Sequence, residues 1–566
     1  MVSKSFKNLK FSFLLFVLIS LINCTNNNKL FNKLSSKQTN ISFNNTIVEN
    51  DTLNILNEEY VFNGGGVISA DFDNDGLIDL FFSGNQKPNK LYLNKGEFNF
   101  KDISSISNIE ALDKWSTGLT YADINNDGLI DIYVCAAMKK ENRNNMLFIN
   151  KGLDKNTGEI LFEEMAKEYG IDDSGNSMGA IFFDYNKDGQ MDLYVLNNEQ
   201  NKSIPTNYRK KIIDGSAVSN DKLYKNNGNG TFTDVTLEAG IIIEGFGLGV
   251  AVADINYDGW PDIFIGNDYT TNDLLYINNR DGTFSNQISK FIKHQSMFSM
   301  GVDISDFNND GYQDIISLDM LGESNYRKKT TISFSTYEKV ILNKRYGYET
   351  QHIRNMLHLG NGAEVPFSEI GLLSNVYQTD WSWSPLFFDA NNDGLRDLFI
   401  TNGFPRDITD KDFSDFRLQV QRFVDPKVLL DSIPIIKQSN YSFINNGDLT
   451  FSDSSVSWGI DKPSFSNGAV FSDLDNDGDL DYIVNNINDE AFIFENKTQE
   501  LNKNNFVQIK LIGPKNNYTG IGAKIVLRDT NDEIQFHENY HTRGYMSSVD
   551  NTIHFGLGNK NKVKSI

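Results

Sequence analysis

Short apolar segments alternate with segments rich in Asp, Asn and Gly along most of the chain. Apolar runs of about four to eight residues between such turns are typical of β-strands rather than helices. Residues 67–70 and 80–82 flank one of these turns, and residues 193–196 follow another. The pattern therefore predicts a β-rich chain of paired strands.

The turn that begins at Asp71 is one of seven copies. It reads DFDNDGLID, with acidic or amide oxygens at positions 1, 3, 5 and 9 and a glycine at position 6. The other copies begin at Asp123, Asp184, Asp254, Asp306, Asp389 and Asp473. Calcium takes six to eight oxygen ligands at about 2.3–2.6 Å, and glycine permits the sharp turn that such a loop needs. We therefore expect calcium as the cofactor, with up to seven ions.

The expected ligands are the side chains at positions 1, 3, 5 and 9 of the seven loops. Position 3 is Asp in the first and last loops and Asn in the other five, so those five should bind more weakly. The complete set is Asp71, Asp73, Asp75, Asp79, Asp123, Asn125, Asp127, Asp131, Asp184, Asn186, Asp188, Asp192, Asp254, Asn256, Asp258, Asp262, Asp306, Asn308, Asp310, Asp314, Asp389, Asn391, Asp393, Asp397, Asp473, Asp475, Asp477 and Asp481.

The sequence of these loops allows two other interpretations. An EF-hand requires Glu at position 12 and a helix on each side, whereas position 12 is Phe82 in the first loop and is never Glu in the others. A solvated, Asx-rich turn would account for a single copy. The repetition argues against that interpretation for the set, although loss of binding in one or two copies stays open.

The spacing of the loops indicates a repeat architecture. Successive loops begin 52, 61, 70, 52, 83 and 84 residues apart, and periods of 40–60 residues with several strands are typical of propellers. Between loops a second piece recurs: an apolar strand, an Asn/Gly turn and then Thr-Phe, as in residues 223–232 and 275–284. This piece is a hairpin signal. Two hairpins per repeat predict a four-stranded blade, and seven repeats predict a ring.

The loops match D-x-[DN]-x-[DN]-G-x-x-D, and the chain resembles the FG-GAP or VCBS repeat proteins, whose propellers are similar to that of integrin α subunits. The resemblance covers about residues 55–500 and implies an all-β, seven-bladed propeller. Residues 501–566, with Gly520-Ile-Gly522 and a segment ending at Gly558, resemble the ASPIC/UnbV module, a small β-rich domain. This module is expected to be truncated or incomplete, because the family continues with another strand.

Two long spacings leave room for inserted segments. Residues 320–352 and 403–438 are expected to be partly helical insertions into the propeller. Trp381 and Trp383 lie between them. Two alternatives are open: the insertions and these tryptophans bind a ligand, or the tryptophans pack in the core of the ring.

Residues 1–24 are expected to be a lipoprotein-type signal peptide. Lys4, Lys7 and Lys10 precede an apolar run over residues 11–22, and the segment ends at Cys24 in a sequence that resembles a bacterial lipobox. Cys24 is therefore the expected lipidation site, although an ordinary secretory signal or an uncleaved anchor stays open. Residues 25–54 are expected to be a flexible tether. These features predict a lipid-anchored protein of the outer membrane or cell surface, secreted if Cys24 is not acylated.

The formal net charge of −23 has a local origin, because the seven loops hold 23 Asp side chains at ligand positions. Seven bound dications would reduce the net charge to −9. The acidity therefore gives no reason to expect nucleic acid as a partner. The other cysteine, Cys135, lies in an apolar segment and is expected to be a buried hydrophobe.

No catalytic or cofactor-binding motif was recognised. The six histidines form no H-E-x-x-H pattern, and no nucleophile elbow or P-loop is present. The favoured hypothesis is a calcium-binding surface propeller that binds or captures a protein or glycan ligand, attached to the membrane only by its N-terminal lipid. The alternatives are a glycan-directed enzyme with structural calcium and a structural subunit of an envelope complex.

Overall fold

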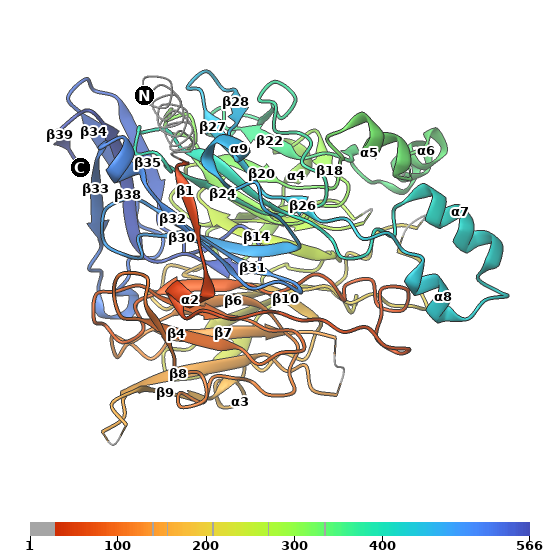
Figure 1. Cartoon of the computed structure of the whole chain (residues 1–566), viewed down its shortest axis with the longest axis horizontal. Helices are drawn as coiled ribbons and strands as arrows, with labels where there is room; N and C mark the ends of the chain where they lie inside the picture. Colours follow the sequence, from red (N-terminus) through yellow and green to blue (C-terminus); the bar gives the residue numbers. More distant parts are fainter. Residues whose placement is uncertain (1–28, 139–140, 156, 207–208, 270, 333–334) are drawn as a thin grey trace, which may run out of the picture.

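The computed structural model describes residues 29–138, 141–155, 157–206, 209–269, 271–332 and 335–566. β-Sheet dominates, and the helices are few and short (Figure 1). This confirms the all-β class that the alternation of apolar and polar segments predicts. Within the described residues, no helix combines the length and apolar character needed to cross a membrane.

Seven antiparallel sheet units, each containing four strands, make up the body of the molecule. In the second unit the order is β6-β7-β8-β9, so the strands are neighbours in sequence and in space. The strands of the seven units are β2 (Val67–Ala70), β3 (Asp79–Phe82), β4 (Lys90–Asn94) and β5 (Phe100–Asp102); β6 (Ser116–Ala122), β7 (Asp131–Ala136), β8 (Met146–Leu153) and β9 (Ile160–Glu164); β10 (Ser177–Phe183), β11 (Asp192–Asn197), β12 (Lys222–Asn226) and β13 (Phe232–Asp234); β14 (Gly247–Ala253), β15 (Asp262–Asn267), β16 (Leu274–Asn278) and β17 (Phe284–Asn286); β19 (Val302–Ser305), β20 (Asp314–Ser317), β22 (Met356–Leu359) and β23 (Ser368–Glu369); β24 (Ser382–Phe388), β25 (Asp397–Asn402), β27 (Tyr441–Asn445) and β28 (Phe451–Asp453); and β30 (Ser466–Ser472), β31 (Asp481–Asn486) and β32 (Phe492–Asn496) with β1 (Phe31–Leu34).

The first strands of the seven sheets contact one another in circular order. β2 contacts β6, and the contacts continue through β10, β14, β19, β24 and β30 back to β2. Glycine permits close approach here: a Cβ on Gly118 of β6 would lie 2.4 Å from the carbonyl oxygen of Met178 in β10. Apolar clusters fill the spaces between neighbouring sheets.

The N-terminal segment supplies the fourth strand of the last sheet. β1 pairs antiparallel with β32, with Phe31 opposite Asn496. The short helix α2 (Ser36–Thr39) follows, and Ile41 and Phe43 are buried. The expected flexible tether is therefore wrong for residues 29–54, because apolar side chains among the polar ones bind this segment to the last repeat. Residues 25–28 lie outside the described part of the chain.

The C-terminal domain contains two small sheets. β33 (Asn505–Lys510) pairs with β38 (Thr552–Gly558), and β34 (Lys524–Asp529) lies between β35 (Ile534–Glu538) and β39 (Val563–Ser565). A short 3₁₀ helix, η1 (Lys515–Asn517), lies before β34.

A hairpin of this domain enters the space enclosed by the first strands. It comprises β36 (Thr542–Arg543) and β37 (Ser547–Ser548), which contact β2, β6, β10, β14, β19 and β30. β37 pairs parallel with β2 through Ser548 and Ile68, and the N–H of Val302 donates to the carbonyl oxygen of Gly544 at 3.0 Å. The chain thus fills its own central space, a feature that sequence analysis did not anticipate.

Charge and aromatic contacts hold this hairpin in place. Arg543 donates to both carboxylate oxygens of buried Asp303 at 2.5 and 2.6 Å. Tyr545 packs against Trp383, with ring centroids 5.1 Å apart. Trp381 stacks on Phe404 with centroids 4.0 Å apart. Both tryptophans therefore follow the core-packing alternative.

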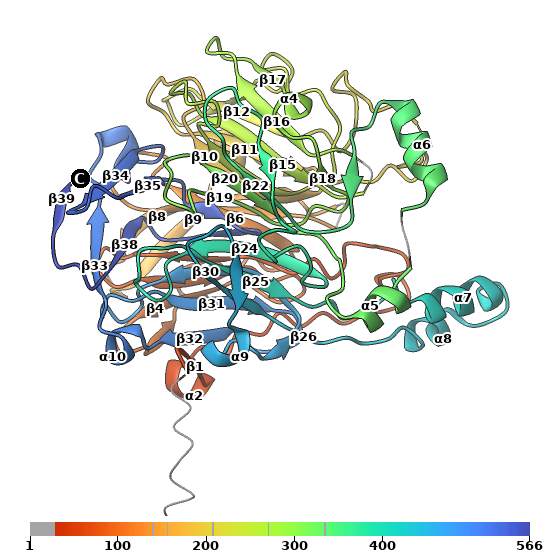
Figure 2. The ribbon, with the colours of Figure 1, turned by 90° about the horizontal axis from the view of Figure 1, so that it is seen from above.

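Helical segments occupy the two long spacings. α5 (Asn325–Thr330) and α6 (Tyr337–Tyr346) lie within residues 320–352, and α7 (Lys411–Val420) and α8 (Pro426–Asp431) lie within residues 403–438. In Figure 2, α7 and α8 project beyond the sheets. Arg327 of α5 joins the two insertions to the body, donating to Asp380 at 2.9 and 3.0 Å and to Asp407 at 2.7 Å.

The remaining elements are short. The helices are α3 (Ala166–Tyr169), α4 (Ile288–Phe291), α9 (Ser455–Trp458) and α10 (Thr498–Leu501). Two-residue strands form small pairs: β18 (Gln295–Ser296) with β21 (Gln351–His352), and β26 (Gln438–Ser439) with β29 (Pro463–Ser464).

The contribution of β1 can be measured by truncating one buried side chain. Phe31 is only 1% exposed, so Phe31→Ala is expected to lower the free energy of unfolding by about 3 kcal/mol. The matched control is Asn32→Ala on the exposed side of the same strand, with an expected change within about 0.5 kcal/mol. Urea denaturation measures both, and equal effects would contradict a packed β1.

Candidate metal loops and an opposite polar cavity

Each acidic loop joins the first strand of a sheet to the second, so strands flank all seven loops. Within the first loop, the N–H of Asp75 donates to Oδ1 of Asp71 at 3.0 Å and to Oδ1 of Asp73 at 3.2 Å. The N–H of Gly76 donates to Oδ2 of Asp71 at 3.0 Å. The other six loops contain the same three hydrogen bonds. One loop geometry is therefore repeated seven times.

The backbone of the loops is left-handed at two positions. The glycine at position 6 has a φ between +86° and +96°, which explains the requirement for glycine. The residue at position 4 also has a positive φ, between 55° and 61°. Five of the seven residues there are asparagines, which tolerate this conformation better than most side chains. The preference for asparagine at position 4 is visible in the sequence, although the motif alone indicates no role for that position.

The carboxylates converge most clearly in the first and last loops. One oxygen from each of Asp71, Asp73 and Asp79 lies within 4.8 Å of the others, and Asp473, Asp475 and Asp477 form a similar group. These are the loops with Asp at position 3. An all-oxygen set of this kind supplies the ligand atoms that a hard cation such as calcium prefers.

The Asp at position 9 also has a structural role. Asp79 is fully buried, and its two oxygens accept the N–H groups of Phe72 at 2.9 Å and Asn94 at 2.8 Å. The position-9 Asp accepts equivalent hydrogen bonds in every loop. This residue therefore fastens the loop to the third strand, whereas sequence analysis considered it only as a ligand.

An asparagine at the end of the third strand connects adjacent sheets. The side-chain amide of Asn94 donates to the carbonyl oxygen of Leu474 in the last loop at 2.8 Å. Asn150 donates in the same way to Phe72 in the first loop at 3.0 Å. Asn278, Asn445 and Asn496 repeat this contact. The recurrent Asn of the hairpin piece was the sequence signal for this contact.

Burial of so many carboxylates affects their protonation. Burial raises the pKa of Asp131, Asp192 and Asp262 to about 8. At position 1, burial raises the pKa of Asp389 to about 8 and that of Asp473 to about 6. A nearby cation would favour the charged form of these groups and offset this cost.

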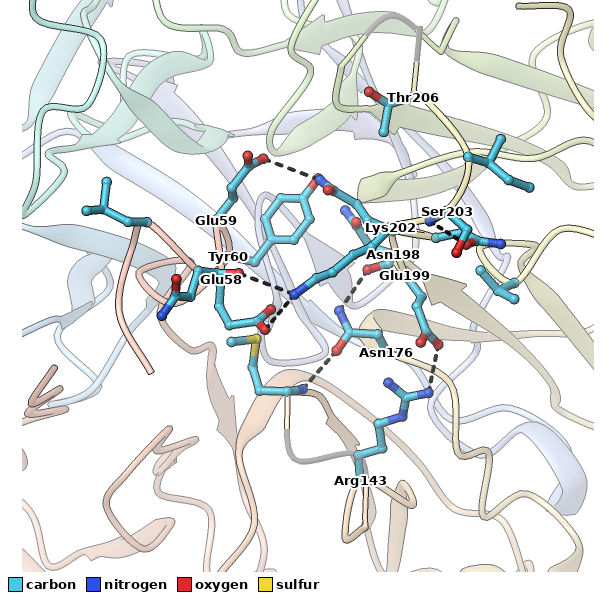
Figure 3. Close-up of a pocket in the computed structure, with 17 residues that line it drawn as sticks. Glu58, Glu59, Tyr60, Arg143, Asn176, Asn198, Glu199, Lys202, Ser203 and Thr206 are labelled. Atoms are coloured by element: carbon cyan, nitrogen blue, oxygen red, sulfur yellow. Dashed lines mark hydrogen bonds and ion pairs between the residues drawn. The ribbon is translucent and has the colours of Figure 1, made fainter. Parts of the chain in front are cut away.

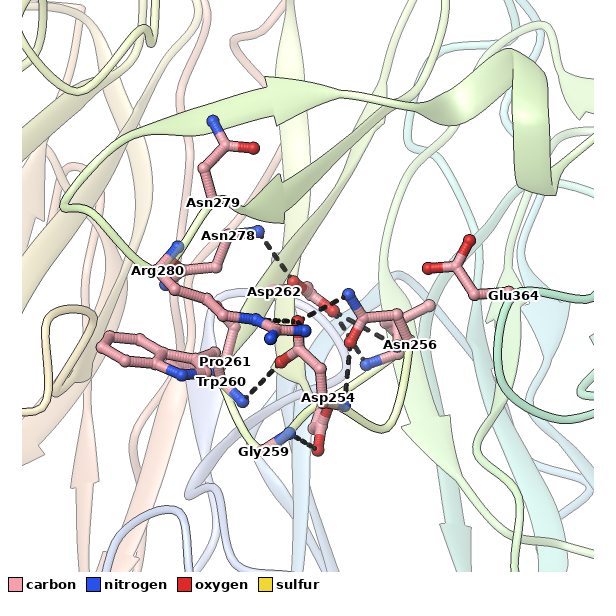
Figure 4. A network of polar contacts seen from close by, with 12 residues as sticks. Asp254, Asn256, Gly259, Trp260, Pro261, Asp262, Asn278, Asn279, Arg280 and Glu364 are labelled. Atoms are coloured by element: carbon pink, nitrogen blue, oxygen red, sulfur yellow. Dashed lines mark hydrogen bonds and ion pairs between the residues drawn. The ribbon is translucent and has the colours of Figure 1, made fainter.

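The fourth loop differs from the others because two cationic side chains form ion pairs with its carboxylates, and Figure 4 shows one of them, Arg280. Nε of Arg280 donates to Oδ2 of Asp258 at 2.9 Å, and Nη2 of Arg280 lies 2.8 Å from the same oxygen. Lys524 of the C-terminal domain forms an ion pair with Asp254. Burial acts to raise the pKa of Asp258, but hydrogen bonds from the N–H of Trp260 and from Arg280 hold it below its usual value.

The C-terminal domain lies against the edge of the sheets that carries the loops. Besides the ion pair of Lys524, Gln508 donates to Asp473 at 2.7 Å and Gln313 donates to Glu538 at 3.1 Å. A ring nitrogen of His554 lies 2.6 Å from Oδ1 of Asn392. Asn516 of η1 also donates to the carbonyl oxygen of Gly189 in the third loop, so loops three to seven each contact this domain.

A polar cavity of about 900 Å³ opens on the opposite edge (Figure 3). Its walls come from residues 56–60 before β2, from the segment after β7, from Asn176 before β10 and from residues 198–206 after β11. Because paired strands are antiparallel, the starts of first strands and the ends of second strands lie away from the loops.

Four of the five charged groups that line this cavity form ion pairs, and the fifth, Glu59, accepts a hydrogen bond from Gln200. Arg143 donates to Glu199 at 2.7 Å, and Lys202 donates to Glu58 at 3.0 Å. The side-chain oxygen of buried Asn198 has no hydrogen-bond partner among the described residues. The cavity therefore presents donors and acceptors whose charges nearly cancel. Sequence analysis missed this site, because its residues come from segments without a shared motif.

Cys135 is fully buried in β7, as expected for a small hydrophobe, whereas Cys24 lies outside the described residues. His541 is also buried and stacks on Tyr121, and burial lowers the pKa of His541 to about 3.

The structural role of position 9 predicts a large effect in the absence of calcium. With chelator present, Asp79→Ala is expected to lower the free energy of unfolding by about 2 kcal/mol or more, because two buried N–H groups lose their acceptor. Asp75→Ala is the matched control, and its smaller expected loss reflects the exposure of Asp75. Chemical denaturation distinguishes the two, and an equal loss would argue against the structural role.

Comparison with known families agrees with the repeated loops. An FG-GAP-like repeat model matches residues 71–134, 212–265 and 254–317, and an ASPIC and UnbV model matches residues 513–566. The loops from Asp184, Asp389 and Asp473 lie outside the matched segments, although they share the loop geometry.

Curated relatives are distant and match only in part. Cartilage acidic protein 1 of Mus musculus is 28% identical over 144 residues, which cover 24% of this chain and 21% of that protein. The T-cell immunomodulatory protein homolog of Plasmodium yoelii yoelii is 28% identical over 199 residues, covering 31% of this chain and 25% of that protein. The chain thus spans about a fifth to a quarter of the length of these relatives. On this evidence, the chain contains FG-GAP-like repeats and a C-terminal ASPIC and UnbV domain.

Proposed function

We propose that this chain is a calcium-binding, seven-bladed β-propeller that acts as a binding or adhesion module. The observation that carries the proposal is the repetition of one loop geometry in seven loops, each with oxygen donors at the same positions. FG-GAP-like repeats and the distant similarity to cartilage acidic protein 1 and a T-cell immunomodulatory protein homolog support a binding or adhesion role.

The propeller assignment is supported by the circular contacts of the first strands. The pairing of β1 with β32 joins the N-terminal segment to the last repeat, which is how a ring of sheets avoids an open seam. The C-terminal hairpin touches six of the first strands and reaches β24 through Tyr545, whose N–H donates to Ser384 at 3.2 Å.

The calcium assignment concerns the loop oxygens. Positions 1, 3 and 5 would hold the ion, and the buried Asp at position 9 would complete the negative charge around it. A bound calcium ion would supply the positive charge that these crowded carboxylates lack. Extracellular calcium modules typically bind with a Kd on the order of 10⁻⁴–10⁻³ M, so we expect weak sites that depend on calcium outside the cell.

We assign ligand capture to the polar cavity opposite the loops. The C-terminal domain contacts several loops, which favours the other edge for a partner. The opposite charges of Arg143 and Glu199 cancel, as do those of Lys202 and Glu58. Amide groups in the lining provide further hydrogen-bond donors and acceptors. A neutral ligand with many hydroxyl groups, such as an oligosaccharide, suits such a surface better than a strongly charged one.

The location of the protein is also a proposal. Lipidation at Cys24 would attach the chain to a cell envelope through its N-terminus, with residues 29–34 leading directly into the last sheet. The net charge of −23 gives no support for nucleic acid as a partner.

Calcium is expected to stabilise the protein. At a tenfold excess of calcium over Kd, one site contributes about 1.4 kcal/mol, so several filled sites should raise the melting temperature well above that in chelator. Thermal unfolding and ion counting by native mass spectrometry are the measurements. Asp71→Ala should remove one ion, whereas Asp412→Ala on exposed α7 should not. Equal melting with calcium and chelator, with no bound ions, would exclude calcium as the cofactor.

The cavity assignment predicts binding of neutral oligosaccharides. Saturation-transfer NMR with a panel of neutral and acidic oligosaccharides should show contact with neutral members. Ser203→Trp, at the exposed rim of the cavity, should abolish that contact by occupying its mouth. Asn531→Trp, an equally bulky change on the exposed C-terminal domain, is the control. Binding that survives Ser203→Trp would place the ligand elsewhere.

A further inference from the structure

The fourth loop contacts more cationic groups than the others. Its position-1 residue, Asp254, forms an ion pair with Lys524, and its position-5 residue, Asp258, forms one with Arg280. In the part of the chain that the structure describes, no other position-1 carboxylate forms an ion pair. In the first and third loops, lysines approach at 3.4–3.9 Å but reach only positions 3 and 5.

These two side chains bond to carboxylate oxygens at two of the expected ligand positions of the loop. Oδ2 of Asp258 accepts hydrogen bonds from Nε of Arg280 at 2.9 Å and from the side-chain amide of Asn256 at 3.0 Å. Oδ2 of Asp254 accepts from Lys524 and from the N–H of Gly259. One ammonium and one guanidinium together carry two positive charges, which equals the charge of one calcium ion.

The source of the lysine gives this arrangement a second consequence. Lys524 begins β34 of the C-terminal domain, and Asp254 begins the fourth loop, 270 residues earlier. Nearby, Glu538 of β35 accepts the N–H of Asp254 at 3.2 Å and the side-chain amide of Gln313 at 3.1 Å. The fourth loop is therefore bonded to the C-terminal domain through both its side chain and its backbone.

We propose that the fourth loop is a docking site for the C-terminal domain in which Lys524 and Arg280 take the place of a calcium ion. This inference rests on the proposed calcium function of the other loops. It assigns the same loop geometry two uses: six copies bind an ion, and one binds a lysine from a distant part of the chain. Calcium at the fourth loop and the contact of Lys524 are then mutually exclusive.

Trp260 provides a local probe of this loop. It stands at position 7, and no other loop contains a tryptophan. Terbium binds at calcium sites and emits when a nearby tryptophan is excited. Because Lys187 of the third loop lies 5.0 Å from the centre of the Trp260 ring, every protein compared also carries Asp184→Ala to remove the third site. The part of the emission that depends on Trp260 then reports occupancy of the fourth loop. Trp260→Phe in each background defines that part.

The experiment compares the full chain with Lys524→Met/Arg280→Met. The protein that keeps Lys524 and Arg280 should bind calcium without terbium emission that depends on Trp260. The double variant should gain this emission and one further ion by native mass spectrometry. Lys95→Met/Lys225→Met, which removes the lysines beside the first and third loops, is the matched control and should gain no such emission.

Each outcome decides one of the two proposals. With the third site removed by Asp184→Ala, Trp260-dependent emission from the protein that keeps Lys524 and Arg280 would overturn the substitution by lysine and arginine. A double variant that folds, by circular dichroism, but gains neither emission nor an ion would overturn it as well. Failure of every protein to bind calcium or terbium would instead overturn the calcium function.

Discussion

The acidic turn is the constraint on which the rest of the structure depends. Each turn must place several carboxylates close together, and the same turn holds three strands and a neighbouring sheet. Asp79 shows this most plainly, because its buried oxygens fasten the turn to Phe72 and to Asn94 of the third strand. Asn94 in turn reaches the carbonyl oxygen of Leu474 in the preceding loop. A change in one turn therefore affects two sheets, and any cation that relieves its repulsion stabilises both.

The two ends of the chain complete an arrangement that the repeats alone leave open. The last repeat provides three strands, and β1 from the N-terminal segment adds the fourth. From the other end, the hairpin around Gly544 fills the space between the first strands. The backbones approach so closely there that a position such as Gly118 has no room for a side chain. The body and the C-terminal domain are therefore interdependent, because the core of one includes a segment of the other.

Local patterns predicted the repeated parts of this structure, and non-local contacts account for what they missed. The strands beside Asp71 and the glycine at position 6 follow from alternation and turn chemistry, which act within a few residues. Residues 29–54 are rich in Asn and Ser, so composition indicated a tether, yet the strand that contains Phe31 pairs with β32, more than 400 residues later. The Lys524–Asp254 pair and the cavity around Asn198 are equally non-local, and no spacing rule signals them.

The two edges of the sheets have different physical characters, and this difference links structure to function. The loop edge is crowded with carboxylates, and its contacts are made within the chain, by the C-terminal domain at Asp254 and Asp473. The opposite edge has a cavity with paired charges, where the side-chain oxygen of Asn198 has no hydrogen-bond partner within the described part of the chain. The loop edge is therefore already engaged in assembly of the chain, whereas the cavity, in the segments that flank the strands, is the larger open concave surface suited to a ligand in the proposed function. In the proposed function, the acidic turns would stabilise the scaffold from one side and leave the other side available for a ligand.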